Sequence, residues 1–166
     1  VLRDGVRRAI FGDAPVLAAL QVMAREHGAE RGLLPASVER DFDRLVESYV
    51  TRLSDQSRAR TFLALTRGEP TGFATSGPSR DGIAWEGEIY ALHVHPRFWR
   101  TRVPKNLVAA CLDFLTQRGF SAARLWVSAS NEELIQGLKT QGFSVLEERY
   151  HARGGQLEQA LVRRLP

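Results

Sequence analysis

The stretch GEIYALHVHP, residues 87–96, decides the fold, because it predicts a central β-strand with a defined end. Alternating, β-branched and aromatic residues favour a strand over 87–94. Pro96 has no amide hydrogen and cannot continue a central ladder. A basic loop follows, and apolar residues then recur on one helical face over 103–118 until Gly119. The sequence therefore predicts a strand, a short polar loop and a long amphipathic helix.

The elements on either side extend this unit in both directions. Downstream, we expect a strand over 123–127, a helix over 132–141 capped by Asn131, and strands over 143–150 and 157–163. Upstream, we expect a strand over 6–11, a helix that begins after Asp13 and ends at Gly28, a helix over 36–53, and a hairpin with strands over 61–66 and 71–75. This order predicts an α/β (α+β) fold with a mixed sheet and helices on both faces.

Length and composition favour one soluble domain over residues 1–166. The chain has 166 residues, and its 43% hydrophobic content can build a core without disulfides or metals. Cys111 is the single cysteine, so an intramolecular disulfide and a cysteine-based zinc site are both excluded. No apolar run reaches the roughly 18 to 20 residues of a membrane span. We therefore expect a cytoplasmic protein that has no membrane partner.

Positive charge is concentrated in the loop that follows the central strand. The formal net charge is +4, and Arg97, Arg100, Arg102 and Lys105 lie within nine residues. A helix N-terminus that follows a strand and a polar loop is a physical anion site, because its first amides are free. We expect a phosphate there, and the alternative is a solvated basic loop without a ligand. Stacking of Phe98 and Trp99 on nucleic-acid bases is a less favoured alternative, since such aromatics more often anchor a loop to the core.

The strand 87–96, the loop, the helix, the stretch ARLWVSASN (123–131) and QGF (141–143) together resemble the GNAT acyltransferase superfamily. The resemblance implies a GNAT fold with a mixed sheet of about seven strands and helices on both faces. It implies acetyl-CoA or another acyl-CoA as co-substrate, in a V-shaped gap between the fourth and fifth strands. The residues expected to contact the cofactor are Leu92, His93, Val94, Arg97, Arg100, Thr101, Arg102, Val103, Lys105 and Asn131.

The pyrophosphate loop departs from the family pattern Q/R-x-x-G-x-G/A. The matching stretch runs from Trp99 to Pro104, with Arg102 at the first glycine position and Pro104 at the second. Arg102 adds a side chain where the backbone should approach the ligand, and Pro104 lacks one N–H donor. Losing one hydrogen bond from a backbone amide to a phosphate costs about 1.5 to 3 kcal/mol. Basic side chains of the loop can bind phosphate oxygens instead.

A second departure concerns the acid that, in the family, protonates the leaving thiolate. The family commonly reads N-x-x-A-x-x-F-Y-x-x-x-G-F here, and Asn131, Gly142 and Phe143 match. Leu138 replaces the tyrosine and cannot donate a proton. We therefore expect thiolate protonation by water or by another residue, with Tyr150 and His151 as possible substitutes.

Glu88 is the candidate catalytic residue, as the acceptor of the amine proton. Strand alternation places it on one face with Tyr90 and Leu92 unless a bulge intervenes. The alternative is a strand-end carboxylate paired with an arginine. His93 and His95 have the spacing of metal ligands in a strand, but no third ligand is evident, so we expect no metal site.

The sequence favours an acyl-CoA-dependent N-acyltransferase that acetylates an amine of a small molecule or peptide. The alternative is a catalytically degenerate GNAT-fold module for binding or dimerisation that no longer uses acetyl-CoA. A homodimer is compatible with both functions. The resemblance places the acceptor pocket near residues 31–40 and 151–156, where the sequence does not identify the substrate.

Overall fold

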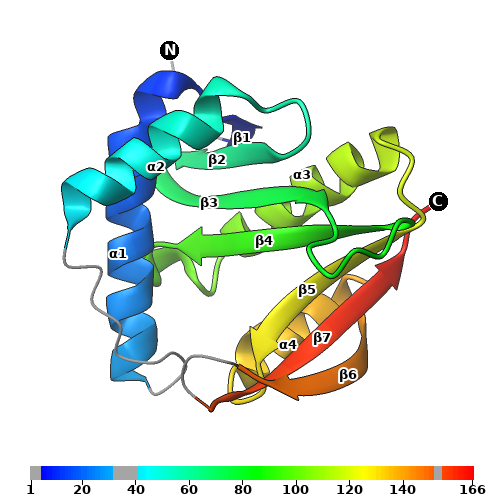
Figure 1. Ribbon diagram of the computed structural model, residues 1–166. Coiled ribbons are helices and arrows are strands. Elements are labelled where there is room, and N and C mark those ends of the chain that lie inside the picture. The colour runs from blue at the N-terminus through cyan, green and yellow to red at the C-terminus, as the bar shows by residue number, and fades with distance from the viewer. Residues whose placement is uncertain (1–4, 32–40, 152–154) are drawn as a thin grey trace.

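The strands of the computed structural model, which describes residues 5–31, 41–151 and 155–166, form one mixed sheet (Figure 1). Its order is β1-β2-β3-β4-β5-β7-β6, and the β4–β5 pair is parallel while all other neighbours are antiparallel. The strands are β1 (Gly5–Arg8), β2 (Arg60–Thr66), β3 (Glu69–Pro78), β4 (Glu86–Val94), β5 (Ala122–Ser128), β6 (Ser144–Tyr150) and β7 (Leu157–Arg164). The predicted seven-stranded mixed sheet is confirmed.

Helices cover both faces of the sheet, as predicted. The described helices are α1 (Ala14–Glu30), α2 (Phe42–Ser54), α3 (Val103–Gln117) and α4 (Glu132–Thr140). Helices α1 and α2 lie together on one face, and α3 and α4 lie on the other (Figure 1). None of the described helices is long and apolar enough to cross a membrane.

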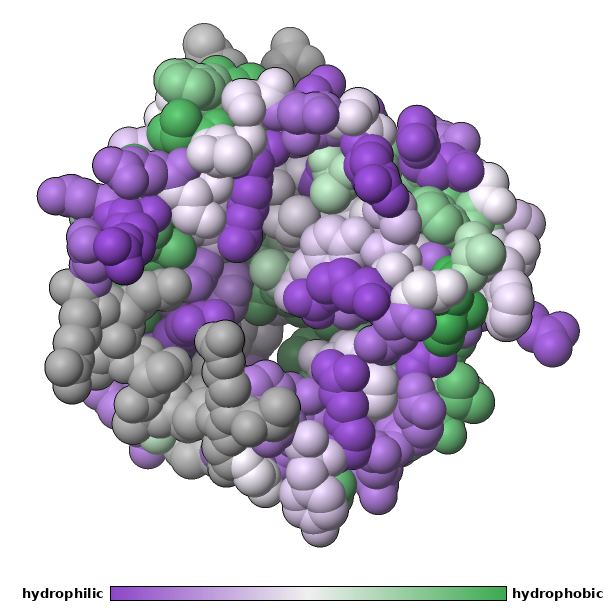
Figure 2. All heavy atoms as spheres, viewed as in Figure 1, coloured by the Kyte–Doolittle hydropathy of each residue, from purple (hydrophilic) through white to green (hydrophobic). Residues whose placement is uncertain are grey.

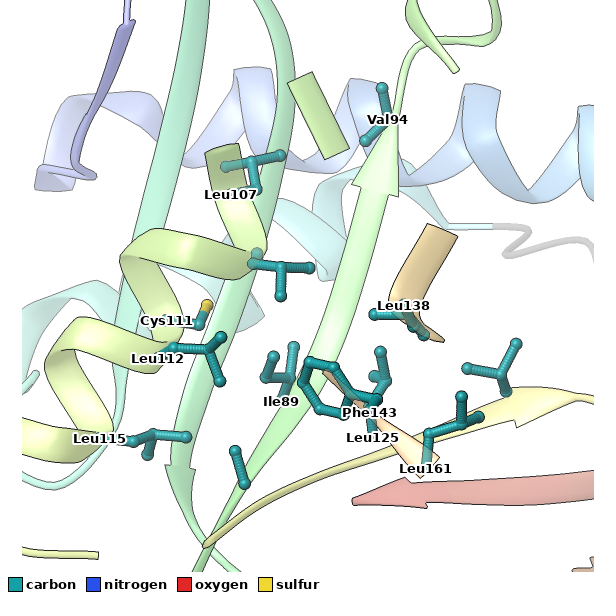
Figure 3. Packing of buried hydrophobic residues seen from close by; sticks show 14 of the residues in the cluster. Ile89, Val94, Leu107, Cys111, Leu112, Leu115, Leu125, Leu138, Phe143 and Leu161 are labelled. Atoms are coloured by element: carbon teal, nitrogen blue, oxygen red, sulfur yellow. The ribbon is translucent and has the colours of Figure 1, made fainter. Parts of the chain in front are cut away.

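Two hydrophobic clusters hold these layers together. The larger one lies between the sheet and α3, where Leu107, Cys111 and Leu115 face Ile89 of β4 (Figure 3). Leu138 of α4 points into the same cluster. The smaller cluster packs apolar residues of α1 and α2 against β2 and β3 on the opposite face. Apolar side chains therefore pack against the central strands from both faces of the sheet.

The structure differs from the sequence-based prediction near the N-terminus. Strand β1 ends at Arg8, before the predicted end at residue 11, because Phe11–Asp13 form a 3-10 turn. Asp13 precedes α1 as expected, but its side chain does not cap that helix. The carboxylate instead pairs with Arg7 at 2.7 Å and accepts a hydrogen bond from the Ile10 amide.

Both N-terminal helices also have boundaries that differ from the prediction. Helix α1 continues past Gly28 to Glu30. Helix α2 begins at Phe42, where Asp41 accepts a hydrogen bond from the Arg44 amide at 3.1 Å. Residues 36–40, the predicted start of this helix, lie outside the described part of the chain.

Strand β4 contains a bulge in the middle of the sheet. Ala91 pairs with Thr75 and Ile89 pairs with Ser76, so Tyr90 is an extra residue on β4. A bulge of this kind bends the strand and changes the direction of its side chains. The simple alternation of Glu88, Tyr90 and Leu92 on one face therefore does not hold.

Candidate active site

The parallel strands β4 and β5 pair only at their beginnings. Glu86, Gly87 and Glu88 pair with residues 122–124, and the strands then separate towards their C-terminal ends. The separation opens a cleft of about 810 Å³. Figure 2 shows that this face of the molecule is hollowed near its centre and bordered mainly by hydrophilic side chains. A volume of this size lies within the usual range of small-molecule and cofactor sites.

Six of the residues predicted to contact the cofactor line the cleft. They are Leu92, His93, Val94, Thr101, Lys105 and Asn131. The first three come from the separated part of β4, which has no strand partner on its β5 side among the described residues. Backbone groups along this edge are therefore available to an extended ligand.

The N-terminus of α3 also faces the cleft, through Pro104 and Lys105. Thr101 Oγ1 accepts a hydrogen bond from the Val103 amide at 3.2 Å, and the Asn106 amide donates to the Arg102 carbonyl at 2.9 Å. Pro104 has no amide hydrogen. No described residue accepts a hydrogen bond from the Lys105 amide, so this amide and the Lys105 ammonium are the groups here that suit an anion.

Trp99 fixes the loop between β4 and α3. Its indole Nε1–H donates to the Val94 carbonyl at 2.7 Å, and its ring packs against the main core together with Phe98. His27 of α1 makes an edge-to-face contact with the same ring at 4.8 Å between centroids. Both aromatic side chains thus anchor the loop against the core.

Charged residues connect this loop with α1 and α4. Arg100 pairs with Glu133 of α4 at 3.0 Å, and Glu133 lines the cleft. Arg31 reaches the same carboxylate at 3.9 Å and lies 5.1 Å from the centroid of the Trp99 ring. Arg100 is therefore held by a carboxylate at the border of the cleft, which the sequence did not reveal.

The other predicted cofactor contacts lie outside the cleft lining. Arg97 and Arg102 are exposed, and Arg102 and Val103 line a separate cavity of about 270 Å³ beside β1 and β2. Cofactor contacts by Arg97, Arg100, Arg102 and Val103 stay predictions. Of the four loop cations, Lys105 is the one that lines the cleft.

Glu88 lies at the point where the strands separate and is paired with an arginine. Its carboxylate is 1% exposed and accepts hydrogen bonds from the Arg80 amide at 2.8 Å and from Arg80 Nε at 3.0 Å. Arg80 also lies 4.8 Å from the centroid of the Tyr90 ring. The ion pair with Arg80 agrees with the alternative interpretation of Glu88 as a carboxylate paired with an arginine. Glu88 also lines the cleft.

Tyr90 and His93 are both uncharged at neutral pH. Burial and the nearby charge of Glu88 raise the pKa of Tyr90, whose hydroxyl donates to the Pro78 carbonyl. Burial, followed by the positive charge of Arg25, lowers the pKa of His93 to about 3. His93 packs 5.2 Å from the Phe73 ring and is a neutral member of the cleft wall.

The wall formed by β5, β7 and β6 carries a cluster whose contacts the sequence did not reveal. Arg149 lies 3.7 Å from the centroid of the Trp126 ring and 3.2 Å from the Glu158 carboxylate. Asp81, from the loop before β4, accepts a hydrogen bond from Trp126 Nε1 at 3.2 Å. All four residues line the cleft. No sequence motif marks them, because they come from four separate segments.

Leu138 occupies the position of the family tyrosine and is 1% exposed. It packs into the main core and also contributes to the cleft wall, without a proton to donate. Of the two substitutes considered above, His151 lines the cleft, whereas Tyr150 is 74% exposed and does not. Asn131 caps α4 as predicted, accepting a hydrogen bond from the Leu134 amide at 3.3 Å.

His93 of β4 and His95, which follows that strand, do not form part of a metal-binding cluster in the described part of the chain. No group of three or more His, Cys, Asp or Glu side chains suited to a metal ion occurs among the described residues. His95 Nδ1 accepts a hydrogen bond from the Arg97 amide at 3.2 Å.

The separated parallel strands, the cleft between them and the helix N-terminus at its border can be compared with known proteins. Residues 25–143 match the Acetyltransferase (GNAT) family. The chain belongs to this family. An uncharacterized N-acetyltransferase of Bacillus subtilis (strain 168), YuaI, is 30% identical over 94 residues, which are 56% of this chain and 54% of YuaI. The match thus spans about half the length of that relative.

Solved structures show the same GNAT fold over nearly the whole chain. The structure of YncA from Salmonella typhimurium with its cofactor acetyl-CoA has a TM-score of 0.80 and 19% identity, covering 99% of this chain and 95% of YncA. The PaiA N-acetyltransferase of Thermoplasma acidophilum in complex with coenzyme A has a TM-score of 0.68 and 14% identity, covering 98% and 99%. At these identities the likeness establishes the fold.

Proposed function

We propose that this chain is an N-acetyltransferase that uses acetyl-CoA, or another acyl-CoA, to acylate an amine of a small molecule or peptide. The observation that carries the proposal is the continuous cleft between the separated strands β4 and β5. It combines an unpaired strand edge with the N-terminus of α3, and these suit the extended and the anionic parts of one ligand. Family membership and the acetyl-CoA in the YncA structure support the same co-substrate.

The residues of the cleft fit such a ligand in three places. Leu92 and Val94 offer the strand edge, Lys105 offers an amide and an ammonium group to phosphates, and Asn131 lies at the start of α4 on the opposite side. Bound acetyl-CoA supplies a thioester, and attack by the amine forms the C–N bond and breaks the C–S bond. The protein's part is to hold the amine at the thioester carbon and to manage two protons.

Glu88 is our candidate acceptor for the amine proton. It lines the cleft at the point where β4 and β5 diverge, and its carboxylate is ion-paired with Arg80. The amine loses one proton as the amide forms, and the departing thiolate gains one. Leu138 cannot supply the second proton, which we assign to water in the cleft.

Binding of acetyl-CoA is the first experiment. Calorimetric titration and thermal unfolding should show saturable binding, since a ligand at 100 times its Kd stabilises the folded state by about 2.7 kcal/mol. Lys105→Gln should weaken binding about tenfold or more, because it removes a charged partner of the phosphates. Lys139→Gln is the matched control, since Lys139 is an exposed lysine of α4 outside the cleft lining.

Release of free thiol in the presence of a panel of small amines and peptides then measures transfer. Catalytic release that depends on the amine supports the enzyme. A chain that binds no acetyl-CoA at millimolar concentration is instead the binding or dimerisation module of the alternative hypothesis, for which the replacements Pro104 and Leu138 are the supporting observations. The homodimer stays a prediction under both functions.

A further inference from the structure

Three arginines from separate segments lie at the end of the molecule where α3 terminates. Arg8 is the last residue of β1, Arg60 is the first of β2, and Arg118 directly follows α3. Arg8 pairs with Phe62 across the strands, so these two side chains share a face of the sheet. Arg60 lies two residues before Phe62 and therefore shares that face.

Phe114 shows that this face is the one covered by α3. Its ring contacts Phe62 at 6.2 Å between centroids, and the guanidinium carbon of Arg60 lies 4.6 Å from the centroid of Phe114. Arg118 follows Phe114 by four residues and is thus its neighbour on the same side of the helix. Arg8 and Arg118 both act electrostatically on Arg60, so the three positive charges lie near one another at the open end of the layer between the sheet and α3.

Arg60 lacks the partner that a buried donor normally has. Its Nε is buried and makes no hydrogen bond with any described residue. Buried donors are almost always satisfied, and leaving one unpaired is costly. The cation–π contact with Phe114 holds the guanidinium group against the ring, and its N–H groups suit an oxyanion.

No carboxylate compensates this positive charge among the described residues. None of the ion pairs found there includes Arg8, Arg60 or Arg118, and Asp113, the single acidic residue of α3, takes part in none of them. Burial, together with the charges of the other two arginines, lowers the pKa of Arg60. The cluster is therefore under mutual repulsion that an anion would relieve.

We infer that Arg8, Arg60 and Arg118 form a binding site for a phosphate-type oxyanion. A guanidinium group binds such an anion through two parallel N–H···O bonds, and the free Nε of Arg60 is one of the donors this geometry requires. The site is distinct from the cleft, because none of the three arginines lines it. The 15 residues of α3 separate this site from the cleft end of the helix by about 22 Å, at about 1.5 Å per residue.

Calorimetric titration with inorganic phosphate and with pyrophosphate, at constant ionic strength, tests the site. The variants are Arg118→Gln, the double variant Arg8→Gln/Arg118→Gln, and Lys105→Gln as a cleft control. Arg8 and Arg118 are exposed, so these variants should fold, and relief of the charge repulsion should keep their unfolding temperature at or above the wild-type value in the absence of phosphate. Each lost guanidinium should weaken binding about tenfold, as expected for a hydrogen bond to a charged group.

The proposal expects saturable binding that falls in the arginine variants and persists in Lys105→Gln. Absence of binding to the wild-type protein overturns it, as does equal affinity in the wild type and the double variant. Loss of phosphate binding in Lys105→Gln alone would place the anion at the N-terminus of α3 and also overturn it. Acetyl-CoA binding is measured separately on the same variants, so a failure of the proposed enzyme function remains distinguishable.

A second arm separates free phosphates from lipid headgroups as the source of the anion. The wild type and the double variant are sedimented with vesicles of phosphatidylcholine alone and of phosphatidylcholine mixed with phosphatidylglycerol. Sedimentation only with the anionic vesicles, lost in the double variant, identifies a headgroup. Binding of soluble phosphate without sedimentation identifies a free phosphate compound.

Discussion

Replacing Pro104 with alanine should tighten the binding of acetyl-CoA, because it restores an N–H donor at the start of α3. Pro104 lines the cleft, and the neighbouring Val103 amide is already bonded to the Thr101 hydroxyl. The first turn therefore offers the Lys105 amide, and Pro104→Ala adds a second donor beside it. A hydrogen bond to a charged group contributes about 1.5 to 3 kcal/mol, so Kd should fall about ten- to a hundredfold.

Calorimetric titration of wild type, Pro104→Ala and Pro96→Ala provides the measurement. Pro96 is the matched control, since it opens a short 3-10 turn and does not line the cleft. Both variants should lose about 0.4 to 1 kcal/mol of stability, because alanine leaves the unfolded chain more flexible than proline does. S-acetylpantetheine lacks the pyrophosphate, and its affinity should be the same for all three proteins. An unchanged Kd of Pro104→Ala for acetyl-CoA refutes the role of this amide.

The remaining predictions concern the base, the core and the pH dependence. Glu88→Gln should lower kcat/KM for amine acetylation by about 10²- to 10⁴-fold if Glu88 accepts the amine proton, and an unchanged thiol-release rate contradicts that role. Gly87→Ala places a Cβ in steric conflict with the buried Leu115 side chain, so urea unfolding should show a loss of about 1 to 3 kcal/mol. Wild-type stability of this variant would show that the core adjusts to the added methyl group. Burial lowers the pKa of His93 from 6.5 to about 3 in the folded chain. Between these two pH values the imidazole is protonated in the unfolded chain and neutral in the folded chain. Stability should therefore fall from pH 6.5 towards 3, by up to about 1.4 kcal/mol per unit from this residue, and His93→Gln should flatten the slope; identical slopes contradict the assignment.

The fold could be predicted because its central unit is local in sequence. Alternation up to Val94, a proline at position 96 and a helical apolar stripe from Val103 each act within a few residues, and the structure confirms the strand and the helix. The bulge at Tyr90 was anticipated only as an exception, because it depends on the register with β3. Alternation alone cannot determine such a register.

The candidate site could be predicted less well, because its polar contacts join distant segments. Arg80 reaches Glu88 only once the loop before β4 folds back over the strand. Glu133 is 33 residues from Arg100, and no spacing rule connects them. The sequence suggests that an arginine could pair with Glu88, but only the three-dimensional structure identifies Arg80 as that arginine.

The loss of the family glycines affects the supply of donors, while the loop backbone at Arg102 is unstrained. Arg102 has φ −76°, a helical value open to any residue, so a positive φ is not needed at this position. The indole of Trp99 bonded to Val94 and the hydroxyl of Thr101 bonded to Val103 fix the loop without glycine. The cleft therefore persists, and the affinity for a pyrophosphate depends on how many amides and cations face it. Pro104 removes one of those amides, so Pro104→Ala tests directly whether this loss limits the affinity for acetyl-CoA.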